Sequence, residues 1–234
     1  MKKIKIDRYL VQEEGRAYEV LKFPFIRHMW AYEDWPENCM AVDGCKEAFA
    51  WLRYAFAILA DYPDKIIYFP CKQEGIGQYY NNNYHLVLLR SGLQFKRHLW
   101  PKIKRKLDKR HYAGKFVLSY DRKKLDDYYR KGLWKKCSQE ESQKQRRKVL
   151  PLEELGFRAY NRRLEEIRGD TMFVVLDRVL WYKWHYQTAK DLDDYRSGKC
   201  NFICSSIGWI VSDGDIQDMY QEAEEEQKKE DSHE

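Results

Sequence analysis

The feature that most constrains the fold is an apolar helix pattern at residues 43–61, DGCKEAFAWLRYAFAILAD. Most of its apolar residues recur at the spacing of one helix face: Cys45, Ala48, Phe49, Leu52, Ala55, Phe56 and Leu59. Trp51 and Ile58 add apolar surface on another side, and Pro63 ends the pattern. A helix that is apolar on several sides needs partners on several sides. The pattern therefore predicts a central helix that is buried in the core.

Short apolar runs elsewhere in the chain provide the partners for this helix. KIIYFP at 65–70, YHLVLLRS at 84–91 and GKFVLSY at 114–120 have the length and composition of strands. The segment KCNFICSSIGWIVSD at 199–213 is also β-like. We predict an α+β fold in which the central helix packs on a small sheet.

The second half of the chain has more helical patterns. Residues 151–170 begin with Pro151 and carry opposite charges at helical spacing. Residues 171–188 fit both a helix and a buried strand, and the length of the apolar pattern favours the helix. The predicted organisation is an α+β domain carrying a basic surface at 1–136, a polar linker or loop at 137–150, a mostly helical region packed on the first domain at 151–211, and an acidic tail at 212–234.

Composition limits the class of protein. A chain of 234 residues that is 44% hydrophobic can build a sizeable core without disulfides. Six cysteines at scattered positions do not form a disulfide framework, and we expect them to be reduced and most of them to be buried. The first residues lack the apolar run of a signal peptide, and AFAWLRYAFAILA is too short for a bilayer and contains Arg53. We expect a cytoplasmic protein with no membrane partner.

Charge is distributed very unevenly along the chain. Residues 96–148 hold 20 Lys and Arg against 6 Asp and Glu, a local net charge of +14. Residues 212–234 hold 2 against 10, a local net charge of −8. Because the whole chain carries +6, the rest of the sequence is neutral. Such an asymmetry bears on binding partners rather than on the fold.

Most of the positive charges of residues 96–148 fall on two predicted helices, one from Pro101 to about His111 and one that begins after a capping Asp121. If Ile103, Leu107 and Leu125 face the core, the cations face outward, and aromatic residues lie among them. Aromatic rings beside phosphate-binding side chains can stack on unpaired bases, so RNA or single-stranded DNA, free or in a nucleoprotein, is the predicted partner. The predicted contact residues are Lys102, Arg105, Lys106, Lys109, Arg110, Lys123, Lys124, Arg130, Lys131, Lys135, Trp100, Tyr112, Tyr128 and Trp134.

Two alternative functions fit parts of the same pattern. Arg105 and His111 have the spacing of the arginine and histidine that HEPN-type ribonucleases carry on one helix, as do Arg178 and His185, although chance alone produces such spacings. A protein-interaction module could dock its basic face on an acidic protein partner. Within the leading prediction of nucleic-acid binding, the basic surface and acidic tail would also suit an accessory protein of a phage or mobile element that blocks a host nucleic-acid machine.

The sequence predicts no metal site and no cofactor. His185 with Cys200 and Cys204, and His28 with Cys39, Cys45 and Cys71, lack the close paired spacing of structural zinc sites. We therefore predict a binding protein rather than an enzyme.

Overall fold

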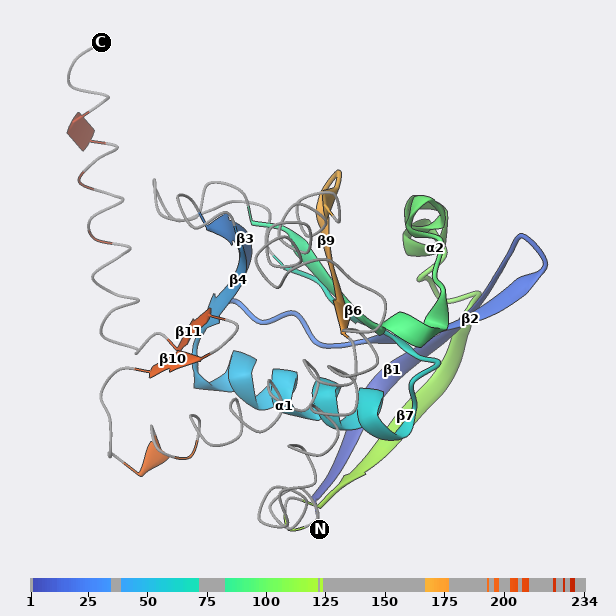
Figure 1. Cartoon of the computed structure of the whole chain (residues 1–234), viewed down its shortest axis with the longest axis horizontal. Coiled ribbons are helices and arrows are strands. Elements are labelled where there is room, and N and C mark those ends of the chain that lie inside the picture. The colour runs from blue at the N-terminus through green and yellow to red at the C-terminus, as the bar shows by residue number, and fades with distance from the viewer. Residues whose placement is uncertain are drawn as a thin grey trace, which may run out of the picture.

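A computed structural model shows the arrangement of the chain. It describes residues 2–34, 39–71, 83–121, 167–176, 203–205 and 208–210, together with the single positions 123, 193, 196, 197, 221, 225, 228 and 229. Within these residues the fold is mixed α+β, as predicted, with two sheets and two α-helices (Figure 1).

The larger sheet has seven strands in the order β7-β1-β2-β5-β6-β9-β8. β1 (Lys2–Glu13) and β2 (Arg16–Lys22) form an antiparallel hairpin, and β7 (Tyr112–Tyr120) pairs with the other side of β1 at the sheet edge. β5 (Ile66–Phe69) lies parallel to β2 and antiparallel to β6 (His85–Arg90). β9 (Thr171–Leu176) is parallel to β6 and antiparallel to β8 (Ile167–Arg168).

The smaller sheet has four strands in the order β10-β11-β4-β3. Its bounds are β3 (Met29–Asp34), β4 (Cys39–Gly44), β10 (Ile203–Ser205) and β11 (Gly208–Ile210). β4 leads directly into α1 (Lys46–Asp61), so the sheet and the first turn of the helix pack closely. A Cβ atom placed on Gly44 would lie 2.7 Å from the Ala48 Cβ and 3.0 Å from the His28 carbonyl oxygen.

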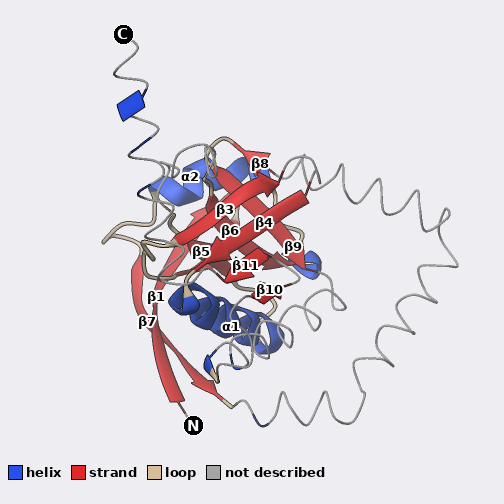
Figure 2. Cartoon of the chain, turned by 90° about the vertical axis from the view of Figure 1, so that its left-hand side faces the viewer, coloured by secondary structure: helices blue, strands red, loops and turns tan. Residues whose placement is uncertain are grey.

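Side chains alternate along each strand, so each strand of the larger sheet contributes to both of its faces. Both faces are covered by a cluster of buried residues. All four residues of β5 are buried. Ile67 and Phe69 join the cluster formed with α1 and the smaller sheet, whereas Ile66 and Tyr68 join a second cluster on the opposite face. Figure 2 shows α1 and α2 on opposite sides of the strands. We call these the α1 face and the α2 face of the sheet.

The α2 face is covered by three short helical segments between β6 and β7. These are η2 (Ser91–Leu93), η3 (Arg97–Leu99) and α2 (Trp100–Arg105). Trp100 packs edge-on against Tyr68 and Phe173, with ring centroids 5.2 Å and 6.0 Å apart. The described helices include none that is both long and apolar enough to cross a membrane.

Several sequence predictions are confirmed. α1 is buried along most of its length, and the runs at 65–70, 84–91 and 114–120 are strands. Cys45 and Cys71 are free thiols in the core, as expected. The predicted linker at 137–150 lies outside the described residues.

The prediction of a more helical second half is not borne out. The described residues of region 151–211 are mostly strands, β8 to β11, and β9 is part of the larger sheet. Residues 171–176 were expected to be helical from the length of their apolar pattern. This segment is instead a strand, because it pairs with β6. The pairing buries Met172 on one face of the sheet and Phe173 on the other.

Candidate functional site

The described part of the basic segment begins with α2 and the turn that follows it. Pro101 occupies the first turn of α2, as predicted, and Ile103 points into the core. The helix is shorter than expected, because it ends at Arg105 rather than near His111. Residues 106–111 then form a turn in which the Asp108 carboxylate accepts a hydrogen bond from the Arg110 backbone N–H and lies 3.1 Å from the His111 Nδ1.

Four lysines of this segment form ion pairs with acidic side chains of other segments. Lys104 pairs with Asp170 beside β9, and Lys106 lies 2.5 Å from Glu13 of β1. Lys96 pairs with Glu14, and Lys115 pairs with Asp7. Lys106 was predicted to be a contact residue. Its ammonium group instead bonds to Glu13 and to the Gln12 carbonyl oxygen, so it anchors the end of α2 to β1.

A second group of cations in the same segment is exposed. Lys102, Arg105, Lys109 and Arg110 all face solvent. Among the described residues, none of them forms an ion pair; the Arg105 Nε–H donates to the Pro101 carbonyl oxygen within α2. The four lysines above form ion pairs with acidic side chains, whereas the charges of this second group are not neutralised by an ion pair among the described residues. We call these four residues, two from α2 and two from the turn that follows it, the basic turn.

The predicted aromatic contacts separate into two kinds. Trp100 is 1% exposed and lies in the core of the α2 face, where its indole N–H donates to the Thr171 hydroxyl, so no base can stack on it. The prediction that Trp100 contacts a ligand is therefore wrong. Tyr112 begins β7 directly after the basic turn, and it is 43% exposed.

Part of the predicted interface lies beyond the described chain. Lys123 is exposed, and its backbone N–H donates to the Asp121 carboxylate at 3.0 Å, as a capping aspartate requires. The remaining predicted contact residues lie outside the described residues: Lys124, Arg130, Lys131, Lys135, Tyr128 and Trp134.

The predicted ribonuclease pairs are not on a common helix where the structure describes them. Arg105 is the last residue of α2, and His111 lies beyond it in the turn that leads to β7. The second pair, Arg178 and His185, lies outside the described residues. In the described residues no three His, Cys, Asp or Glu side chains gather closely enough to hold a metal ion.

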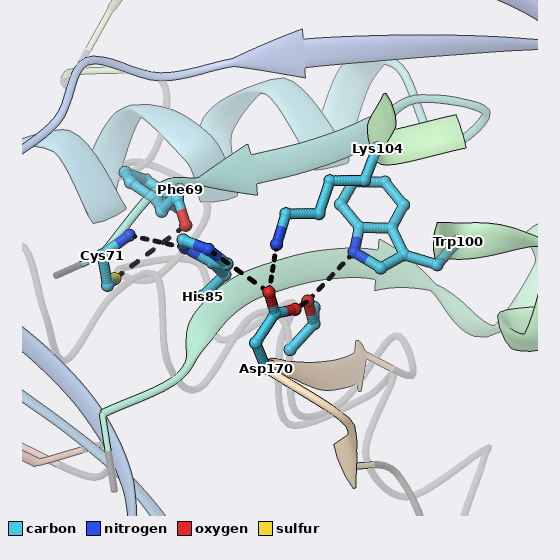
Figure 3. A network of polar contacts seen from close by, with 7 residues as sticks. Phe69, Cys71, His85, Trp100, Lys104 and Asp170 are labelled. Carbon is cyan, nitrogen blue, oxygen red and sulfur yellow. Dashed lines mark hydrogen bonds and ion pairs between the residues drawn. The ribbon is translucent and has the colours of Figure 1, made fainter. Parts of the chain in front are cut away.

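A polar network that the sequence did not reveal lies beneath α2 (Figure 3). His85 Nδ1 accepts a hydrogen bond from the Cys71 backbone N–H at 3.0 Å, so a neutral ring carries its proton on Nε2. Nε2 lies 3.8 Å from the Asp170 carboxylate. Asp170 also accepts from Lys104 and from the Thr171 hydroxyl. Spacing could not have predicted this cluster, because Asp170 and Thr171 are far in the sequence from His85 and Lys104.

The network has a positioning role. Burial, and to a lesser degree the nearby Lys104 charge, lower the pKa of His85, so the ring is neutral at pH 7. Burial alone would raise the pKa of Asp170, but hydrogen bonds from Lys104 and Thr171 outweigh it and lower that pKa. Burial raises the pKa of the Cys71 thiol to about 12, so this thiol is a poor nucleophile at neutral pH. The group therefore fixes α2 against the ends of β6 and β9.

Comparison with protein-family models, with curated proteins and with solved structures found no match to this chain.

Proposed function

We propose that this protein binds nucleic acid, either free or within a nucleoprotein complex, through the basic surface of residues 96–148. The observation that carries the proposal is the division of the cations around α2. Lys104 and Lys106 are neutralised by Asp170 and Glu13. The basic turn lies beside them, exposed and uncompensated among the described residues.

This arrangement supports a polyanionic ligand for an electrostatic reason. Like charges clustered on one surface repel one another, and a phosphate backbone relieves the repulsion while releasing its own counterions. An exposed tyrosine follows the basic turn and can contact bases. An acidic protein could meet the same charge, but it would offer no bases to stack on that ring.

The ribonuclease alternative has less support. Its pair would need to act from one helix, and α2 ends before His111. We therefore propose a binding function.

The test compares two pairs of cations of equal charge. Lys109→Ala with Arg110→Ala removes half of the basic turn, and Arg27→Ala with Lys46→Ala removes an exposed pair beside the smaller sheet. Arg27 directly precedes His28 and Lys46 directly follows Cys45, and the Cys45 backbone N–H donates to the His28 carbonyl oxygen. Binding of a labelled single-stranded oligonucleotide is measured by fluorescence anisotropy across a salt series.

We expect wild-type affinity to fall steeply with salt, by about a few hundredfold between roughly 50 and 200 mM if about six phosphates of a single strand are contacted. Loss of Lys109 and Arg110 should weaken binding and reduce the slope of log affinity against log salt by about 1.4. The Arg27 and Lys46 control should leave that slope unchanged. Wild-type protein that binds no oligonucleotide but binds polyglutamate would overturn the proposal in favour of an acidic protein partner.

A further inference from the structure

The outer half of the β1–β7 ribbon has one covered face and one open face. Ile4 and Ile6 of β1 are buried on the α1 face. Lys3 and Lys5, which alternate with them, are exposed on the opposite face. In Figure 1 the ribbon runs past the other strands toward the N-terminus, with α1 along one side.

β7 contributes to the same open face. Its residues opposite Lys3, Lys5 and Asp7 are, in order, Ser119, Val117 and Lys115, and all three are exposed. Directly paired residues of an antiparallel ladder share a face. The open face therefore presents lysines, a serine and a valine that is 49% exposed, with Asp7 neutralised by Lys115.

A β-bulge brings Tyr112 onto this open face. Asp7 pairs with Lys115 and Tyr9 pairs with Tyr112, so two residues of β7, Ala113 and Gly114, oppose one residue of β1. Gly114 has φ of +94°, a conformation that glycine adopts without strain. Without the extra residue, strand alternation would place Tyr112 on the face opposite Lys115. The bulge instead puts both residues on one face.

Tyr112 is held in place on this face by a second ring. The Tyr9 and Tyr112 rings meet edge-to-face with centroids 5.7 Å apart, and Tyr9 also packs against the core of the α2 face. Tyr112 immediately follows Lys109, Arg110 and His111 in the chain. The ring therefore lies where the basic turn joins the open face of the ribbon.

We infer that the open face of the β1–β7 ribbon binds single-stranded nucleic acid, with a base stacked on Tyr112 and the phosphate backbone held by Lys3, Lys5 and the basic turn. The inference rests on the proposed function and assigns the surface and the form of the ligand. Two observations support it. The bulge places Tyr112 on the open face, and the alternation of side chains along β1 places Lys3 and Lys5 on the same face.

The form of the ligand follows from the chemistry of a flat aromatic platform. A base can stack on a tyrosine only when it is not already stacked within a duplex. Exposed lysines beside the ring neutralise the phosphates that join successive bases. A blunt duplex would offer phosphates to the basic turn but no base to Tyr112.

The test compares two tyrosines that lie on opposite sides of β7: Tyr112, which belongs to β7, and Tyr62, which follows α1. Tyr112 is 43% exposed and contacts Tyr9, whereas Tyr62 is 41% exposed and contacts Phe116 edge-to-face at 5.1 Å. Phe116 packs against the α1-face cluster, so Tyr62 is on the far side of the ribbon. Tyr112→Ala, Tyr112→Phe and Tyr62→Ala are compared with wild type for binding to fluorescein-labelled oligothymidylate and oligouridylate of roughly 15 nucleotides.

Tyr112→Ala should weaken binding about tenfold or more, since stacking on one ring typically contributes a factor of this size. Tyr112→Phe should retain most of the affinity, and Tyr62→Ala should match wild type. Circular dichroism and thermal unfolding check that the variants are folded. Affinity for a blunt duplex should be equal in wild type and Tyr112→Ala.

A second variant pair tests the lysines without touching the rings. Lys3→Ala with Lys5→Ala should weaken single-strand binding and lower its salt slope by about 1.4, and the Arg27 and Lys46 control should not. Wild-type binding that depends on the basic turn but is unaffected by Tyr112→Ala and by loss of Lys3 and Lys5 would overturn the inference alone. Absence of any salt-dependent binding by wild type would overturn the proposed function as well.

Discussion

At the scale of single residues, His85 connects β6 to Asp170, which in turn pairs with Lys104 of α2. Its ring accepts from the Cys71 backbone N–H, and its other nitrogen faces Asp170, which Lys104 holds from α2. The charged groups near the ring are Lys104, Asp170 and Lys22. A positive ring would lose the hydrogen bond from Cys71 and face two lysines, so the fold favours the neutral form.

His85 should therefore make the protein less stable in mild acid. Its folded-state pKa lies below the ordinary value of 6.5, so its contribution is complete above that pH and declines as the pH falls toward the folded-state pKa. In His85→Asn, the side-chain oxygen can replace Nδ1 as acceptor but does not titrate. The free energy of unfolding, measured in urea at about pH 7.5 and pH 5.5, should fall less in the variant than in wild type.

The titration of Asp170 does not contribute to the change in unfolding free energy over this pH range. Its pKa is lowered from 3.8, so its contribution to stability is lost only at more acidic pH. Equal losses of stability in wild type and His85→Asn would show that His85 titrates as it does in the unfolded chain.

At the scale of elements, the join between β4 and α1 depends on the absence of a side chain at Gly44. The smaller sheet reaches the helix there, and the backbone N–H of Cys45 donates to the His28 carbonyl oxygen at 3.0 Å. That same oxygen and the Ala48 Cβ occupy the space that a Cβ on residue 44 would need.

Gly44→Ala should therefore destabilise the protein by about 1–3 kcal/mol, because the backbone at His28, just before β3, or the first turn of α1 must move to admit the methyl group. Gly92→Ala is the matched control. Nothing lies within 4 Å of a Cβ at Gly92, and its φ is not in the left-handed region, so its effect should stay within about 0.5 kcal/mol. Chemical denaturation of both variants measures the difference. Similar small effects at both positions would mean that β4 and α1 are less tightly packed than the structure indicates.

At the scale of the whole molecule, the two charged blocks of the sequence have opposite signs. Residues 96–148 carry a net +14 and residues 212–234 a net −8. Of the tail, the structure describes Gln221, Glu225, Lys228 and Lys229, all in helical conformation. Because both blocks belong to one chain, we predict that the acidic block competes with an external polyanion at a high effective concentration.

Deletion of residues 219–234 should therefore tighten oligonucleotide binding at low salt, and the difference from the full chain should narrow as salt rises. Attraction between exposed charges is strong only within about a Debye length, roughly 10 Å at 0.1 M salt. Titrations of both proteins at about 50 and 300 mM salt measure the effect. Equal affinities at the lower salt concentration, with both proteins folded, would show that the tail does not mask the basic surface.

The sequence by itself determined the elements whose spacing and composition match one type of secondary structure over a short range. The spacing from Cys45 to Leu59 predicted α1, and the β-branched and aromatic runs predicted β5, β6 and β7. Pro101 marked the start of α2, and charge counting located the basic segment. These signals are local, because helix and strand periods and capping rules act over a few residues.

Only the tertiary structure decided the rest. Pairing with β6 made residues 171–176 a strand, against the helical spacing of their side chains. Burial against Tyr68 and Phe173 removed Trp100 from the predicted interface, and Glu13 neutralised Lys106. The bulge at Gly114 set the face of Tyr112. The physical reason is the same in each case: the partner that fixes the burial, charge or direction of a side chain comes from a segment distant in sequence, or from a register that no short pattern encodes.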